Sequence, residues 1–242
     1  MGKCAPRHRR KSRHVLGVVP AEDLLFPPVR GIGLHRVVES RHYARRRAGR
    51  GVHAFEPHIV DLGNETSRAE FKKIWPIGKF PVLRDEARGQ TIPESSIIIE
   101  YLSQHYPGKT ELVPTDADLA RETRSRDRFY DLYVDEPMQK IVTDRLRPAG
   151  KNDPHGVEQS KALLQIAYGM IDEAMKTKTW SIGDAFSMAD CAAAPALFYA
   201  DLVMAFADTH KNAAAYLRRL MERPSFARVV EEAQPYFKLF PN

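Results

Sequence analysis

The first feature that suggests chemistry is a proline inside a strand-like segment, residues 78–83. Pro81 removes a backbone donor from any sheet that it joins, so its presence needs a reason. One reason is a cis bond to Phe80, which about 5–6% of such bonds adopt. That bond would turn the Phe80 amide and carbonyl toward a ligand. A plain edge-strand proline explains the segment without a ligand, so both interpretations stay open.

The second feature is the pair Glu94 and Ser95, which stands where a helix is expected to begin. Ser95 is a natural N-cap, and the first amides of a helix can hold a carboxylate. Glu94 supplies a negative charge for an ammonium group. The head of a free amino acid, which carries both charges on one carbon, would suit this pair. A helix cap beside a solvated glutamate is the alternative.

The third feature is a capping box, Ser187 and Asp190, at the start of an alanine-rich segment. Phe186 is placed to pack as a hydrophobic staple against Cys191. Small side chains after Cys191 allow close helix packing, which predicts a buried helix. We therefore interpret Cys191 as a core thiol rather than a reactive one.

The elements around these motifs change character along the chain. We expect short strands at 59–60, 79–84 and 91–92, and helices at 67–74 and 94–105, the first of them with a capping box of Ser67 and Glu70. From residue 116 the periodicity is helical only, with a further cap at Asp153 and Pro154. The predicted domains are an atypical basic segment, 1–52, an α/β domain, 53–109, and an all-helical domain, 116–242.

Taken together, the proline strand, the second strand and the Glu-Ser helix start resemble the glutathione site of the glutathione S-transferase family, of the bacterial cytosolic type. The resemblance covers about 190 residues, and the capping box of the second domain belongs to it. It implies a thioredoxin-like N-terminal domain, an all-α C-terminal domain, glutathione as co-substrate and no metal. Phe80 and Pro81 would offer main-chain contacts, Glu94 and Ser95 would hold the γ-glutamyl end, and Lys79 would reach the glycine carboxylate.

The resemblance also implies a Tyr, Ser or Cys after the first strand that bonds the glutathione sulfur. Counting back from Phe55 places this residue near positions 37–43. Ser40 is the nearest candidate and Tyr43 the second, behind a strand near residues 32–38. The alternative is that Ser40 is an ordinary serine in a disordered segment.

Residues 1–52 hold thirteen Lys and Arg and three acids, so this segment carries a net charge of +10, whereas the whole chain carries +6. We interpret the segment either as the product of a shifted reading frame or misplaced start, or as a basic arm joined to a divergent first strand. Because the remaining chain is mildly acidic, we do not expect nucleic-acid binding. No apolar run is long enough to span a membrane. Two isolated cysteines fit a reducing cytoplasm.

The resulting functional prediction is an enzyme of detoxification that conjugates glutathione to an electrophilic small molecule. We expect the acceptor between the domains, with Phe129, Tyr130 and Tyr133 as candidates for its apolar wall. The alternative is a non-catalytic protein that binds glutathione or another ligand on the same scaffold. The resemblance also implies a homodimer.

Overall fold

The computed structural model describes residues 15–20, 55–60, 64–79, 81–108, 110–234, 237 and 240. Strands and helices alternate in the first half of the described chain, and only helices follow. In chain order they are β1 (Val15–Pro20), β2 (Phe55–Val60), α2 (Glu65–Ile74), β3 (Val82–Asp85), β4 (Gln90–Pro93), α3 (Ser95–His105), α4 (Ala117–Tyr130), the π-helical turn η2 (Asp131–Asp135), α5 (Glu136–Arg145), α6 (Pro154–Ala174), α7 (Met188–Val203), α8 (Lys211–Glu222) and α9 (Pro224–Ala233).

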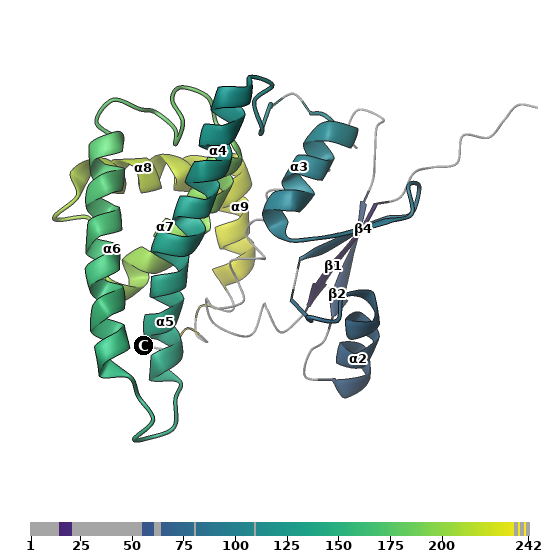
Figure 1. Cartoon of the computed structure of the whole chain (residues 1–242), viewed down its shortest axis with the longest axis horizontal. Helices are drawn as coiled ribbons and strands as arrows, with labels where there is room; N and C mark the ends of the chain where they lie inside the picture. Colours follow the sequence, from purple (N-terminus) through teal and green to yellow (C-terminus); the bar gives the residue numbers. More distant parts are fainter. Residues whose placement is uncertain are drawn as a thin grey trace, which may run out of the picture.

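The four strands form one mixed sheet with the order β2-β1-β3-β4. β1 runs parallel to β2 and antiparallel to β3, and β3 and β4 form an antiparallel hairpin. Gly89, which has a φ of 64°, lies in the turn between β3 and β4. In Figure 1, α3 lies between the sheet and α4, so it is the element through which the sheet meets the helices.

The position of β1 was not predicted. The sequence suggested a first strand near residues 32–38, which lie outside the described residues, whereas the described first strand is Val15–Pro20. Its run of valine and leucine is the short, continuous apolar pattern of a strand buried within a sheet, and such a pattern lacks the alternation that marks an exposed strand. The basic N-terminal segment thus supplies an interior strand.

Two predicted helix starts are corrected. α2 begins two residues before Ser67, and the Asn64 side chain caps it by accepting from the Ser67 amide at 3.1 Å. The expected box of Ser67 and Glu70 therefore lies inside the helix. In α3 the N-cap is Glu94, and Ser95 is the first helical residue rather than the cap. Both predicted ends, Ile74 and His105, are confirmed.

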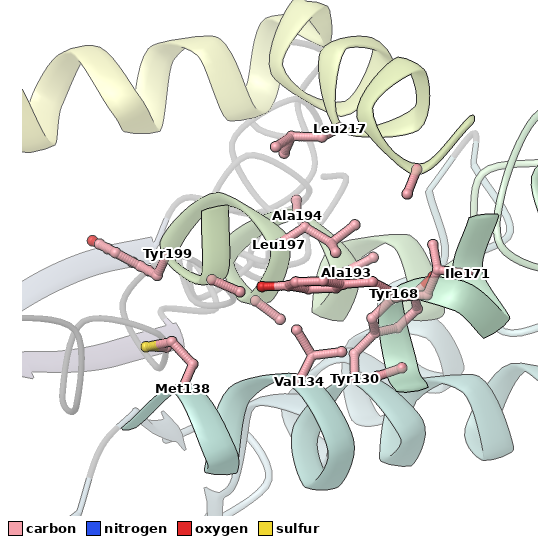
Figure 2. Packing of buried hydrophobic residues seen from close by; sticks show 14 of the residues in the cluster. Tyr130, Val134, Met138, Tyr168, Ile171, Ala193, Ala194, Leu197, Tyr199 and Leu217 are labelled. Carbon is pink, nitrogen blue, oxygen red and sulfur yellow. The ribbon is translucent and has the colours of Figure 1, made fainter. Parts of the chain in front are cut away.

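The helical half is built around α7. Figure 2 shows α7 in the centre of the packed side chains, with residues of α4, η2, α5, α6 and α8 around it. The alanines of α7 are buried, which lets neighbouring helices approach closely, and Leu197 has no exposed surface. The predicted capping box is present, and Asp190 also accepts from the Ser181 amide at 2.8 Å and from the Tyr216 hydroxyl at 2.6 Å. Cys191 is buried, as expected.

No helix in the described part of the chain is both long and apolar enough to cross a membrane.

Candidate functional site

The two motifs that suggested ligand binding meet at one edge of the sheet. In the β3–β4 hairpin, Val82 pairs with Pro93 and Leu83 pairs with Ile92. Continuing this antiparallel register by one residue brings Pro81 opposite Glu94. Pro81 is buried and Glu94 is exposed at the start of α3. The register therefore brings together the proline strand and the helix start, which are separated in sequence by the hairpin.

The backbone at Glu94 is strained. Among the residues that the structure describes, Glu94 is the one non-glycine residue with a positive φ, at 67°, with a ψ of 123°. A side chain with a Cβ occupies such a conformation only when its surroundings impose it, and such residues cluster at binding and active sites. The chain turns from β4 into α3 at this strained residue. Glu94 therefore lies beside the first amides of the helix.

The start of α3 has the properties of an anion site. The first amides of any helix lack partners within the helix, and the helix dipole favours negative charge there. Within the described residues, no side-chain hydrogen bond from the N-cap closes this end. Ser95 is half-buried beside these amides. A ligand carboxylate can thus bind the helix start while a ligand ammonium group faces Glu94.

The segment before Pro81 contains a tight turn and the predicted residue Lys79. Gly78, with a φ of 70°, donates from its amide to the Trp75 carbonyl at 2.9 Å and closes a turn that contains Pro76. Proline at the second position and glycine at the fourth suit such a turn. Lys79 follows, and its side chain is exposed. Phe80, Ser40 and Tyr43 lie outside the described residues, so their predicted roles remain predictions.

A buried hydrogen bond ties the helix start to the helical domain, and sequence reasoning missed it. Ser96 on α3 donates to Asp127 on α4 at 2.8 Å, and both side chains are buried. Arg128 reaches the same Asp127 oxygen at 3.2 Å and Ser96 at 3.3 Å. A charged acceptor strengthens such a bond, and its burial holds the geometry of the α3 start against α4.

One signal for this contact was present in the sequence. Asp127 falls on the buried stripe of α4, in line with Ala120, Thr123 and Tyr130. A carboxylate on an otherwise buried stripe requires a partner on a neighbouring element. The sequence alone does not identify that partner, because Ser96 lies 31 residues away.

An ion pair also joins α3 and α4 at the surface. The Nε and Nη2 atoms of Arg124 each donate to the Glu100 carboxylate at 2.8 Å. The hydrogen bond to Glu100 raises the pKa of Arg124 and outweighs burial, which acts to lower it. The two-point geometry fixes α3 relative to α4 more firmly than a single contact would.

The predicted acceptor residues do not form one exposed wall. Phe129 and Tyr130 are buried in the core cluster of the helical domain, and burial raises the pKa of Tyr130 to about 12. Tyr133 lies in η2 and is 46% exposed, with its ring centroid 5.6 Å from that of Phe129. Because a helix turns about 100° per residue, Phe129 lies roughly 200° around α4 from Asp127, which contacts α3. Phe129 therefore faces away from the helix start.

Within the described residues there is no group of His, Cys, Asp or Glu arranged to hold a metal ion.

Comparison with known proteins identifies relatives for both halves of the chain. Residues 34–110 match the family description "Glutathione S-transferase, N-terminal domain", and residues 131–224 match "Glutathione S-transferase, C-terminal domain". The glutathione S-transferase-like protein LUC7 of a Fusarium species is 30% identical over 167 residues, which are 67% of this chain and 74% of that protein. Glutathione S-transferase GstB of Escherichia coli K12 is 24% identical over 163 residues, 67% of this chain and 78% of its own.

Solved structures share the fold. A glutathione S-transferase from Methylobacillus flagellatus, solved with glutathione bound, aligns with a TM-score of 0.69 and 22% identity over 90% of this chain and 98% of its own. The glutathione transferase URE2P6 from Phanerochaete chrysosporium was solved with oxidised glutathione. It aligns with a TM-score of 0.73 and 18% identity over 93% of this chain and 98% of its own.

Proposed function

The chain belongs to the glutathione S-transferase family, and from this premise we propose that it binds glutathione at the sheet edge and transfers it to an electrophilic small molecule. The single observation that carries the proposal is the strained Glu94 at the start of α3, opposite Pro81. A strained, exposed glutamate beside the first amides of a helix lowers the stability of the fold and is not needed to begin a helix. It would, however, help to bind a ligand that carries two opposite charges, because the amides hold the negative group and the glutamate holds the positive one.

In the proposed complex the γ-glutamyl end of glutathione occupies the α3 start. Its carboxylate accepts from the first amides of the helix and from Ser95, and its ammonium group pairs with Glu94. The cysteinyl backbone lies along Phe80 and Pro81, and Lys79 approaches the glycine carboxylate. Such placement fixes the thiol beside the acceptor, and positioning contributes more to a bimolecular reaction than a modest fall in thiol pKa.

We place the sulfur-binding role at Ser40, following the family resemblance. For the acceptor, the exposed position of Tyr133 supports a role in binding better than the positions of Phe129 and Tyr130, which the core encloses. The proposal extends to a cytoplasmic, detoxifying homodimer.

The test is glutathione binding by calorimetry in the wild type and in a double variant, Glu94→Ala with Ser95→Ala. Loss of the charge-assisted hydrogen bonds should weaken binding by roughly 2–4 kcal/mol. Glu158→Ala, an exposed glutamate on α6, is the control and should leave binding unchanged. Unchanged affinity in the double variant would refute the proposed site.

The transfer step needs its own assay, with a thiol-reactive aromatic acceptor. Formation of the thioether should depend on both the wild-type protein and glutathione, and should decrease in the double variant. A protein that binds glutathione but forms no thioether with a panel of electrophiles would refute the transferase assignment while leaving the site intact.

A further inference from the structure

Two aromatic side chains are neighbours near the end of α7. Phe198 and Tyr199 lie in the second half of this alanine-rich helix, and their ring centroids are 5.2 Å apart in an edge-to-face arrangement. Figure 2 shows Tyr199 at the margin of the labelled core residues, with its ring directed away from Tyr168. Tyr199 is nevertheless only 7% exposed, so another part of the chain covers it.

The cover comes from the segment that follows α9. Phe240 stacks on Tyr199, with an interplanar angle of 3° and 6.0 Å between the ring centroids. The ring of Phe237 lies 5.7 Å from that of Phe198, measured in the same way. The Phe240 amide donates to the Phe237 carbonyl at 3.0 Å, so both residues belong to one turn of the chain. This aromatic pair, Phe237 and Phe240, thus places one ring on each aromatic residue of α7.

The contacts that place the aromatic pair are individually weak. A single hydrogen-bonded turn is not stable by itself, because several backbone angles are fixed for one hydrogen bond. The position of the pair therefore depends on its ring contacts with α7, and each contact of this kind contributes little. Phe237 and Phe240 are also only partly buried, so solvent reaches both side chains. A free molecule with a comparable ring can thus compete with them for the same surface.

The surface beneath the aromatic pair favours a flat, uncharged ring. Stacking on Tyr199 at an interplanar angle of 3° requires a planar partner. Burial raises the pKa of the Tyr199 hydroxyl, which keeps this group neutral at physiological pH. Phe226 on α9 adds a third ring, 6.2 Å from that of Phe198. The two phenylalanines that the chain itself supplies therefore indicate the chemistry that this surface accepts.

We propose that Phe198 and Tyr199 form a binding surface for planar aromatic molecules, which the aromatic pair occupies when no such molecule is bound. The inference goes beyond the proposed function, because it requires neither glutathione nor the transfer step. Binding at this surface releases Phe237 and Phe240, so the ligand and the chain compete for α7. The affinity for an aromatic ligand is then set by the difference between two stacking arrangements.

The test is fluorescence titration with prodan, a neutral naphthalene dye. Phe237→Ala combined with Phe240→Ala removes the competing rings and keeps the length of the chain. We expect this double variant to bind prodan about five- to a hundredfold more tightly than the wild type does, the usual effect of two aromatic contacts. Equal affinities in the two proteins would overturn the proposal, and so would a failure of both to bind the dye.

Two substitutions added to that double variant separate a specific surface from general exposure of apolar groups. Tyr199→Leu keeps an apolar side chain and removes the ring, so it should abolish most of the gain in affinity. Ile166→Ala is the matched control, since Ile166 is 62% exposed on α6, and it should leave the affinity unchanged. If Tyr199→Leu binds prodan as tightly as its parent, the dye needs no ring on α7 and the proposal is wrong.

A labelled chain covers the case in which Tyr199→Leu fails to fold. Phe240 is replaced by para-fluorophenylalanine, and fluorine NMR then reports the surroundings of its ring. Saturating prodan should move the resonance to the position found in the unfolded chain, because the ring leaves Tyr199 for water. The same label at the buried Phe71 of α2 is the control and should not respond. A Phe240 resonance that stays in place while prodan binds would overturn the proposal.

Discussion

At Glu94 the protein holds an unfavourable backbone conformation at the point where the proposed ligand binds. A positive φ costs a residue with a Cβ about 1–3 kcal/mol, and glycine avoids that cost. A residue selected only to begin α3 would therefore be glycine, serine or aspartate in a relaxed conformation. In the proposed function the Glu94 carboxylate contributes only when a ligand is bound. Stability therefore favours glycine at this position, whereas ligand binding favours glutamate.

We therefore expect glycine at position 94 to relieve the backbone strain and, at the same time, to weaken ligand binding. Glu94→Gly removes the strain and the carboxylate together, whereas Glu94→Ala removes only the carboxylate. We expect the glycine variant to be more stable than the alanine variant by about 1 kcal/mol in the free energy of unfolding. Both should bind glutathione more weakly than the wild type. Denaturant titration and calorimetry measure the two quantities, and a glycine variant less stable than the alanine variant would contradict the strain argument.

A second residue-scale prediction concerns Asp85, at the end of β3. Its side chain is fully buried and accepts from the Tyr101 hydroxyl at 2.8 Å, the Tyr106 hydroxyl at 2.5 Å and the Arg88 amide at 3.2 Å. Burial acts to raise the pKa of Asp85, but these hydrogen bonds outweigh it, and the pKa lies below the usual value of 3.8.

The sign of the pH effect follows from this lowered pKa. The ionised form is favoured by folding, so its contribution is fully present above the unfolded pKa of about 3.9 and is lost as the pH falls through the lower folded value. Asp85→Asn should lose about 1–3 kcal/mol at pH 7. Its unfolding free energy should also fall less steeply than that of the wild type below about pH 4.

The matched control is Asp118→Asn, in the first turn of α4. The Asp118 carboxylate is exposed and pairs with Arg121 at the surface. This variant should keep the wild-type acid dependence, because exposed pairs contribute little. Equal acid dependence in Asp85→Asn and the wild type would show that the buried carboxylate does not control acid stability.

At the scale of elements, the sheet depends on a strand from the basic N-terminal segment. β1 pairs on both sides, with β2 along Val15–Pro20 and with β3 through Val18 and its neighbours. An interior strand cannot lose a backbone donor without breaking a ladder.

We therefore expect Val18→Pro to unfold the sheet and abolish glutathione binding. Val18→Ile keeps the backbone donor and the β-branched side chain, so it should bind normally. The helical content should persist in the proline variant, because the core around α7 lies in the helical domain. Circular dichroism and calorimetry distinguish these outcomes. Normal binding by Val18→Pro would show that residues 15–20 are not required for the site, as the frame-error interpretation of residues 1–52 predicts.

At the scale of the whole molecule, exposed apolar residues occur on α3 and on η2, which directly follows α4. Ile97 on α3 is 50% exposed and Leu132 in η2 is 46% exposed. Glu100 on α3 forms an ion pair with Arg124 on α4, and Arg128 on α4 is exposed. This surface, where α3 and α4 meet, combines apolar groups with charges, as protein interfaces do. It is the surface that we expect to form the homodimer.

The test is Ile97→Asp combined with Leu132→Asp. We expect light scattering to give a dimer for the wild type and a mass near 27.5 kDa, that of one chain, for the variant. Ile166→Asp is the matched control, since Ile166 is 62% exposed and belongs to α6, a helix that Figure 1 shows well apart from α3. Dimers that persist in the double variant, or dissociate equally in the control, would contradict this assignment.

The sequence predicted the parts of the molecule whose signals are local. The Ser187 and Asp190 box, the cap at Asp153 and the end of α3 each depend on neighbours within a few residues, and each is confirmed. The resemblance predicted the α/β domain followed by helices, and the family comparisons bear this out.

What the sequence missed depends on distant partners. β1 lies far in sequence from both of its neighbouring strands, so nothing next to it marks it as a strand. Similarly, Asp127 meets Ser96 only when α4 lies against α3.

The order of strands in this sheet has a consequence for how the protein is made. β1 is synthesised first, but its antiparallel partner is complete only at Asp85, roughly 65 residues later. At about 5–20 residues per second, a ribosome needs roughly 3–13 s to cover that distance. Throughout this interval β1 lacks its antiparallel partner, and of its two neighbouring strands only β2 can emerge before β3. We therefore expect ribosome-associated chaperones to bind nascent chains of this protein at residues 15–20. They should be released once β3 has left the exit tunnel.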